Sequence, residues 1–244
     1  IKRLKILLFF FTVGCSANNN TSYLKNIDFK ERKIFNEWGN VEESEIILLA
    51  IHGYNDYSNS FKIPGEIFSK YNIYTKAFDL RGFGKNKNSG LWFPLNVHMK
   101  DIKNELFKIK SIYPKKKIFL LGESMGGAIV ISLASSDKKL PIDGIVMLAP
   151  AIWNFTEKNF LKSYFMNFFS RILPNLQVES KGWVDVQASD NIEMLKELAK
   201  DKFFIHKPNL RSLYGVITLM DKSYKNAREF FIDTTYNTLL IVPL

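Results

Sequence analysis

The sequence predicts an α/β fold in which a mostly parallel β-sheet carries helices on both faces. Apolar runs that suit strands buried on both faces alternate with segments of helical spacing. Hydrophobic residues make up 46% and charged residues 24% of the 244 residues, which is the balance of a globular protein with a full core. A Gly-x-Ser-x-Gly sequence also joins one of these strands to a helix.

Strands and helices are expected to alternate from residue 45 onward. Near-continuous apolar runs predict strands over residues 45–51, 73–78, 117–121, 144–148 and 238–242. Helical spacing predicts helices over residues 64–70 and 97–113, where Pro64 suits a first turn and Pro114 stops the second helix. Because helices separate successive strands, we expect the strands to run parallel.

The first fifteen residues are predicted to be a separate module. A basic start precedes an apolar run over residues 6–13 and then Gly14 and Cys15, which is the shape of a secretory signal. The run is too short to span a bilayer, which takes about 20 residues. A Cys after Gly14 resembles a bacterial lipoprotein processing site. Residues 1–14 are therefore expected to be a signal peptide, and residues 15–27 a lipidated Cys15 with a polar tether.

This N-terminus predicts a membrane-anchored lipoprotein of the bacterial cell envelope; a secreted or periplasmic protein is the alternative. The net charge is +10, but the lysines are scattered and the cluster at residues 115–117 has no nucleic-acid-binding motif around it. We therefore expect a solvated basic surface and no nucleic-acid partner. One Cys excludes an internal disulfide, and three His with one Cys show no metal-ligand spacing, so no metal or cofactor is expected.

The residues with the clearest chemistry are at 122–127, Gly-Glu-Ser-Met-Gly-Gly. A nucleophilic Ser124 has to stand on a sharp turn between a strand and a helix, and Gly122, Gly126 and Gly127 leave room for that turn. The backbone N–H of Met125 points from the start of the helix toward developing negative charge. This pattern predicts a nucleophile elbow.

A second loop agrees with this interpretation. An oxyanion hole needs one N–H group from the residue after the nucleophile and another from the loop after an earlier strand. His52, Gly53 and Tyr54 directly follow the predicted strand over residues 45–51, so the Tyr54 backbone suits the second donor. His52 is expected to support the loop, because the catalytic base comes last along the chain in this arrangement.

These motifs together resemble the α/β-hydrolases of the monoacylglycerol lipase, lysophospholipase and serine aminopeptidase branch. The shared features are the strand with its His-Gly loop, the Asp-x-Arg-Gly-x-Gly segment at residues 79–84 and the elbow, with weaker similarity near residues 189–195 and 213–221. The resemblance implies an α/β-hydrolase core over residues 28–151, a helical lid over 152–235 and a returning core strand over 236–244.

The resemblance also implies a serine hydrolase that cleaves lipid-like carboxylic esters, such as lysophospholipid or monoacylglycerol, through an acyl-enzyme on Ser124. One alternative is an amidase or aminopeptidase of the same fold, because the fold does not separate ester from amide cleavage. The other is a catalytically inactive fragment or a pocket-binding lipoprotein. The oligomeric state is left open.

The triad order of this fold is Ser, then Asp or Glu, then His. The acid would follow the strand over residues 238–242, so we expect the catalytic Asp and His beyond Leu244, the last strands and helix to be missing, and this chain to be inactive alone. His206 lies in the lid and is not expected to be the base. Asp185 or Asp221 could replace the acid but not the base, and Phe230 and Phe231 are expected to be poorly covered.

The first part of the lid is rich in aromatic residues at helical spacing. One interpretation is an apolar wall for an acyl chain that also docks on a membrane. The other, which the sequence favours, is that these side chains pack the lid onto the main domain. The residues concerned are Trp153, Phe155, Phe160, Leu161, Tyr164, Phe165, Phe168 and Phe169.

Overall fold

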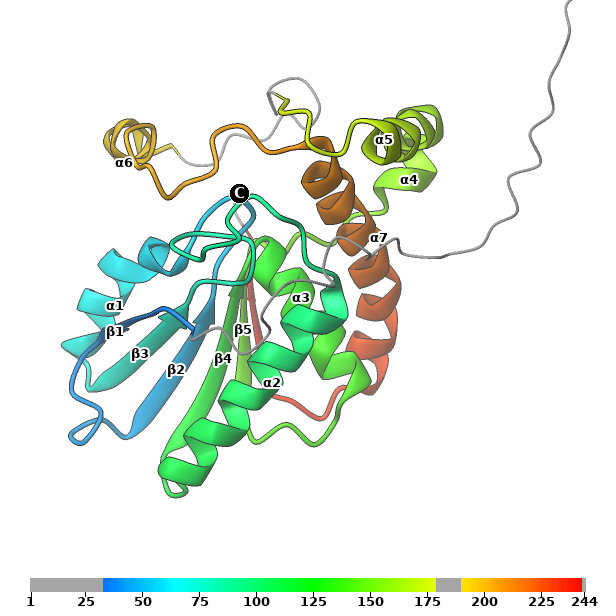
Figure 1. Cartoon of the computed structure of the whole chain (residues 1–244). Coiled ribbons are helices and arrows are strands. Elements are labelled where there is room, and N and C mark those ends of the chain that lie inside the picture. Colours follow the sequence, from blue (N-terminus) through cyan, green and yellow to red (C-terminus); the bar gives the residue numbers. More distant parts are fainter. Residues whose placement is uncertain (1–32, 179–189, 243–244) are drawn as a thin grey trace, which may run out of the picture. The chain divides into compact units, whose positions relative to one another are not determined.

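The computed structural model describes residues 33–178 and 190–242, which contain a six-stranded sheet with flanking helices (Figure 1). The strand order is β1-β3-β2-β4-β5-β6, in which β1 is antiparallel to β3 and every other pair is parallel. The strands are β1 (Phe35–Trp38), β2 (Ile46–Ile51), β3 (Ile73–Phe78), β4 (Lys117–Glu123), β5 (Gly144–Leu148) and β6 (Thr238–Ile241). The predicted α/β fold is confirmed.

Prolines mark the starts of two helices, of which the one at Pro64 was expected from the sequence. The helices are the short η2 (Ser58–Phe61), α1 (Lys62–Ser69), α2 (Leu95–Ile112), α3 (Met125–Ser136), α4 (Phe155–Lys158), α5 (Phe160–Ile172), α6 (Ile192–Leu198) and α7 (Leu210–Asp233). Pro64 stands in the first turn of α1, and α2 begins directly after Pro94. Both positions suit proline, which has no N–H group to offer to a helix.

The strand β1 was not predicted. Its sequence, Phe-Asn-Glu-Trp, is too short and too polar to show a period, and its partner β3 lies some forty residues further along the chain. Phe35 pairs with Phe78 in this register, and their rings lie 5.9 Å apart. Long-range pairing therefore created a strand where local pattern gave no signal.

Burial on both faces explains why β2 is apolar throughout. Ile47, Leu49 and Ile51 point into the larger core, which includes side chains of α2, α3 and α7. Leu48 and Ala50 point the other way, into a smaller core that includes Phe61 and partly buried side chains of α1. A parallel strand covered on both faces reads as a continuous apolar run for this reason.

Helices α4 to α7 occupy the chain between β5 and β6, where the lid was expected. Figure 1 shows α5 beside the start of α7, and α7 running back along α3. Close packing at α7 needs Gly215, because a Cβ there would lie 2.3 Å from the ring of Trp92. No helix among residues 33–178 and 190–242 is long and apolar enough to cross a membrane.

Two expectations about apolar side chains need correction. Phe230 is not poorly covered: it is 2% exposed, although its neighbour Phe231 is half exposed. The aromatic residues of α5 do not pack the lid onto the main domain, because each of them is at least 44% exposed. Phe155, by contrast, is buried as the packing interpretation required.

Several predictions concern residues outside the described part of the chain. They are the signal peptide at residues 1–14, the lipidated Cys15 and its tether at 15–27, the first residues of the core segment, and Asp185 as an alternative acid.

Candidate active site

Ser124 stands between β4 and α3 in a backbone conformation that non-glycine residues rarely adopt, with φ 50° and ψ −114°. Its N–H donates to the carbonyl oxygen of Leu148 at 2.9 Å, and its own carbonyl oxygen accepts from Ala128 and Ala151 at 3.1 and 2.8 Å. These three bonds hold the strained turn in place. Strain that the surroundings fix in this way is typical of a functional position.

The glycines around Ser124 are there because no side chain fits. A Cβ on Gly126 would lie 2.1 Å from the carbonyl oxygen of Ile51, and one on Gly122 would lie 2.7 Å from the backbone of Gly126. A Cβ on Gly127 would lie 2.8 Å from Pro150. The turn therefore forms only where β2, β4 and the chain after β5 approach one another closely.

The loop after β2 lies against the nucleophile. A Cβ built on Gly53 would be 3.4 Å from Cβ of Ser124. The Tyr54 hydroxyl donates to Oγ of Ser212 in α7 at 3.0 Å, and the Tyr54 ring packs edge-on against Phe83. The side chain of Tyr54 is thus anchored to α7 and Phe83, while its backbone belongs to the loop whose Gly53 lies against Ser124.

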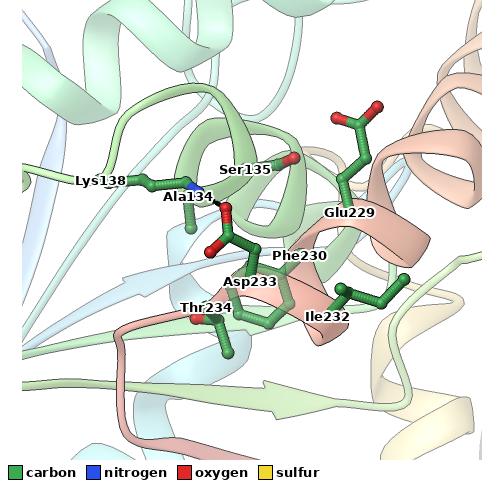
Figure 2. A pocket seen from close by; sticks show the side chains of 8 residues that line it. All are labelled: Ala134, Ser135, Lys138, Glu229, Phe230, Ile232, Asp233 and Thr234. Carbon is green, nitrogen blue, oxygen red and sulfur yellow. Dashed lines mark hydrogen bonds and ion pairs between the residues drawn. The ribbon is translucent and has the colours of Figure 1, made fainter.

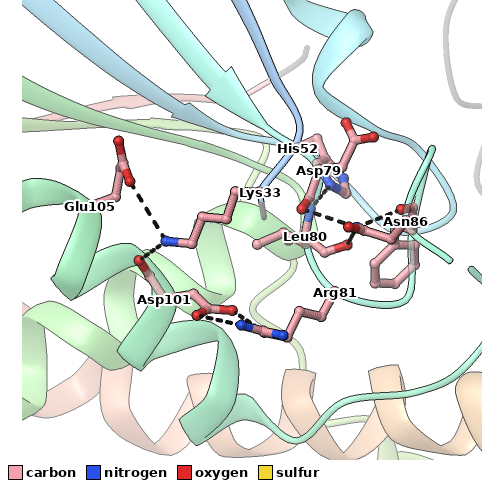
Figure 3. Close-up of polar contacts among 9 residues, drawn as sticks. Lys33, His52, Asp79, Leu80, Arg81, Asn86, Asp101 and Glu105 are labelled. Carbon is pink, nitrogen blue, oxygen red and sulfur yellow. Dashed lines mark hydrogen bonds and ion pairs between the residues drawn. The ribbon is translucent and has the colours of Figure 1, made fainter. Parts of the chain in front are cut away.

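His52 is buried, and both of its ring nitrogens are engaged. Figure 3 shows its contact with Leu80. Nε2 accepts from the N–H of Leu80 at 2.9 Å, so the proton is on Nδ1, which donates to the carbonyl oxygen of Gly53 at 2.8 Å. Burial lowers the pKa of His52 to about 4. This histidine connects the loops after β2 and β3 and has no nitrogen left to accept a proton from Ser124.

Asp79 holds the loop after β3 in place through its side chain and its backbone (Figure 3). Its Oδ1 accepts from the N–H and the hydroxyl of Ser58 at 3.0 and 2.5 Å, and its Oδ2 accepts from the N–H of Lys85 at 2.8 Å. The amide of Asn86 donates to the carbonyl oxygens of Asp79 and Leu80. Residues 79–84 therefore form a rigid turn next to His52.

Two carboxyl groups beside the elbow were missed by sequence reasoning. Burial raises the pKa of Glu123 to about 7, and the nearby charge of Asp56 raises it further. Burial also raises the pKa of Asp56 to about 6, with smaller contributions from Asp201 and Asp79. The Gly53 N–H donates to the Glu123 carboxylate, which offsets part of the burial effect. Only the fold brings Asp56 near Glu123, so no local signal in the sequence could have indicated this pair.

A triad base is absent from the neighbourhood of Ser124 within the described residues. His98 is buried between the rings of Trp92 and Phe93, and the exposed His206 bonds through Nε2 to the carbonyl oxygen of Asp201 at 2.8 Å. Asp221 of α7, weighed above as an acid, instead accepts from the N–H and hydroxyl of Thr156 in α4. The same described residues contain no group of three His, Cys, Asp or Glu that could hold a metal ion.

A cavity at the far end of α3 is separate from the elbow. A space of about 280 Å³ lies between the C-terminal ends of α3 and α7, where Lys138 pairs with Asp233 (Figure 2). Ser124 is at the other end of α3, twelve helical residues away. We therefore place the candidate site at the elbow and not in this cavity.

A strained serine between a parallel strand and a helix, faced by a glycine-containing loop, defines the α/β-hydrolase class of fold. The chain belongs to the serine aminopeptidase S33 family of hydrolases, whose family model matches residues 42–241. This confirms the resemblance found in the sequence.

Curated relatives and solved structures agree with this assignment. The chain is 24% identical to rat (Rattus norvegicus) monoglyceride lipase over 155 residues, which are 59% of this chain and 51% of the relative. It is 22% identical to phospholipase YtpA of Bacillus subtilis over 68% of this chain and 63% of the relative. The chain thus spans about half to two thirds of the length of these relatives.

The fold is also that of solved lipases and esterases. The monoacylglycerol lipase of Paleococcus ferrophilus superimposes with a TM-score of 0.67 at 18% identity, over 87% of this chain and 89% of that one. A thermostable carboxyl esterase of Bacillus coagulans gives a TM-score of 0.64 at 16% identity, over 87% and 86%. At these identities the likeness establishes the fold.

Proposed function

We propose that this protein is a serine ester hydrolase that acts on lipid-like carboxylic esters such as monoacylglycerol or lysophospholipid. The observation that carries the proposal is the strained Ser124 at the start of α3, directly opposite the Gly53 loop. Its hydroxyl oxygen would attack the acyl carbonyl, the alcohol would leave, and water would then release the acid from the acyl-enzyme.

The oxyanion of each tetrahedral intermediate would be held by backbone N–H groups of Tyr54 and Met125. Met125 opens α3, so its N–H is one of the groups that a helix leaves without an internal partner. Gly122, Gly126 and Gly127 allow the close approach, and His52 and Gly53 support the second donor's loop. Fixed N–H donors of this kind stabilise developing charge without having to reorganise.

The described histidines do not supply the base of the triad. His52 has both nitrogens bonded, His98 is in the core, and His206 contacts the backbone of its own loop. We therefore propose that the base and the acid of the triad come from residues outside the described part of the protein.

The substrate class is supported by the names of the relatives, which include monoglyceride lipases and a phospholipase. Amide cleavage by the same machinery is the competing activity, because the matching family model describes a serine aminopeptidase. A parallel assay of an aminoacyl-nitroanilide and a nitrophenyl ester separates the two.

The nucleophile is tested with protein expressed from its complete reading frame. Ser124→Ala should lower the turnover of nitrophenyl butyrate by at least about a thousandfold, as for other serine nucleophiles. Ser135→Ala in the same helix is the control and should retain turnover. Equal turnover by wild type and Ser124→Ala would refute the proposal.

We also propose that lipid on Cys15, outside the described residues, attaches the protein to the membrane of the bacterial cell envelope. Cys15→Ser should move the protein from the membrane fraction to the soluble fraction of the expressing cells. An unchanged membrane fraction would refute this attachment.

A further inference from the structure

The carboxyl group of Glu123 lies against the loop after β2. Strand β4 ends at Glu123, and the register of β2 and β4 pairs Ile51 with Gly122. Two residues beyond Ile51, a Cβ built on Gly53 would be 3.8 Å from Oε2 of Glu123 and 3.9 Å from its Cδ. The Gly53 N–H donates to this carboxyl group. The residue directly before the nucleophile thus bonds to the residue directly before Tyr54.

Gly53 is held at both of its backbone groups. Its N–H donates to Glu123, and its carbonyl oxygen accepts from Nδ1 of His52 at 2.8 Å. Packing adds little restraint, because a Cβ on Gly53 would meet nothing closer than Cβ of Ser124 at 3.4 Å. Glycine has the widest choice of backbone conformations of any residue. The two hydrogen bonds are therefore what restricts the backbone at this position.

This restriction extends to the N–H of Tyr54. In a trans peptide the carbonyl of Gly53 and the N–H of Tyr54 lie in one plane and point in opposite directions. A turn of the Gly53 backbone therefore also turns the Tyr54 N–H. The side chain of Tyr54 is fixed separately, since its hydroxyl donates to Oγ of Ser212 in α7 at 3.0 Å. Gly53 is thus the part of this loop that a lost hydrogen bond would free.

Glu123 is mostly neutral below about pH 7. Burial, with a smaller contribution from the charge of Asp56, raises the pKa of Glu123 to about 7, while the bond from Gly53 partly opposes the shift. A neutral carboxyl group still has an oxygen that accepts a hydrogen bond. It also places no negative charge beside the nucleophile. A Gln side chain would offer the same acceptor at the same charge.

We propose that Glu123 is a positioning residue for ester hydrolysis, whose carboxyl oxygen holds the Gly53 N–H and thereby keeps the Tyr54 N–H directed at the oxyanion. The proposal rests on the proposed function, because it requires Ser124 to form a tetrahedral intermediate. An oxyanion donor acts on the transition state more than on the bound ester. Loss of the Glu123 contact should therefore lower kcat and leave KM nearly unchanged.

A matched pair of variants tests the contact in protein expressed from its complete reading frame. Gln and Met are close to Glu in length, but only Gln keeps a strong acceptor. At about pH 6, Glu123→Met should lower kcat for nitrophenyl butyrate by at least about tenfold, with KM changed by less than about twofold. Glu123→Gln should keep kcat within about threefold of wild type. Glu45→Met, on an exposed side chain just before β2, is the control and should match wild type.

A transition-state analogue separates positioning from a purely structural role. An alkyl trifluoromethyl ketone forms an anionic hemiketal on a serine nucleophile, so its inhibition constant reports on the oxyanion donors. This constant should rise in Glu123→Met by the factor by which kcat/KM falls, and should stay near the wild-type value in Glu123→Gln. All assays are run below the lowest thermal midpoint. Glu123→Ala, which also lacks the acceptor, should show the same pattern and replaces Glu123→Met if that variant does not fold.

Three results would overturn the role of Glu123: wild-type kcat in Glu123→Met, an equal loss in Glu123→Gln, or a loss that is carried by KM. The failure of this inference is distinguishable from that of the proposed function. Wild-type turnover by Ser124→Ala would overturn both. An inactive Ser124→Ala together with wild-type turnover by Glu123→Met would overturn the role of Glu123 alone.

Discussion

The N–H of Leu80 donates to Nε2 of His52 at 2.9 Å, so one buried imidazole joins the loop after β3 to the loop after β2. Its Nδ1 closes the connection by donating to Gly53. The histidine in the His-Gly pair is therefore a structural bridge beneath the loop assigned to the oxyanion.

Removing this bridge should destabilise the protein. We expect His52→Ala to lower the free energy of unfolding by about 2–4 kcal/mol, because it leaves a cavity and two buried backbone groups without partners. Urea unfolding measures the change. His206→Ala, on an exposed side chain, is the control and should change stability by less than about 0.5 kcal/mol; a similar loss in both variants would contradict the role given to His52.

Acid should destabilise the protein through its buried histidines. Burial lowers the pKa of His98 to about 4, while Asp101 partly opposes the shift. Between pH 6.5 and 4 the unfolded chain then binds more protons than the folded one, so stability falls as the pH falls. At pH 5 this single group costs about 2 kcal/mol relative to pH 7.

The variant His98→Leu should lose that part of the pH dependence. Unfolding free energies at pH 5 and pH 7 should differ less in His98→Leu than in wild type, by about 2 kcal/mol. His206→Asn should keep the wild-type difference. An unchanged difference in His98→Leu would show that His98 does not titrate in this range.

Glu123 should have the opposite pH dependence. Burial raises its pKa to about 7. Between about pH 4.5 and 7 the folded state then holds the proton more tightly, so stability falls as the pH rises through this window. Glu123→Gln should therefore be more stable than wild type at pH 8, by about 3 kcal/mol, and closer to it at pH 4.5. Chemical unfolding at both pH values decides this; a variant less stable than wild type at pH 8 would contradict it.

Gly126 should tolerate no side chain. A Cβ there would meet the carbonyl oxygen of Ile51 at 2.1 Å, which neither backbone can avoid without moving. We expect Gly126→Ala to lower stability by about 2 kcal/mol or more and to abolish ester turnover. The thermal midpoint of Gly126→Ala is compared with that of Ser135→Ala, a control in the same helix. Equal midpoints would show that the elbow has room for a Cβ at residue 126.

Local pattern was sufficient for the central strands and the elbow. β2, β4 and β5 are largely apolar because both faces of a parallel strand are buried. The spacing of Gly122, Ser124 and Gly126 follows from a turn in which neither glycine admits a Cβ. These features depend on neighbours in the sequence, so the sequence alone predicts them.

The rest depends on contacts between distant residues. β1 exists because it pairs with β3, and the raised pKa of Glu123 depends on its burial in the fold and on Asp56 from another loop. The periodicity of α5 predicts an apolar stripe but not its direction. That direction comes from the fold, in which Ser163 and Met166 on the opposite face are buried and Ser163 bonds to Thr156 of α4.

Covalent trapping decides whether Ser124 is the nucleophile. Full-length protein is treated with a fluorophosphonate and the modified residue is located by peptide mass spectrometry. We expect one adduct, on the peptide that contains Ser124, and none in Ser124→Ala. Ester turnover by a wild-type protein whose adduct lies on another residue, or which forms none, would contradict it.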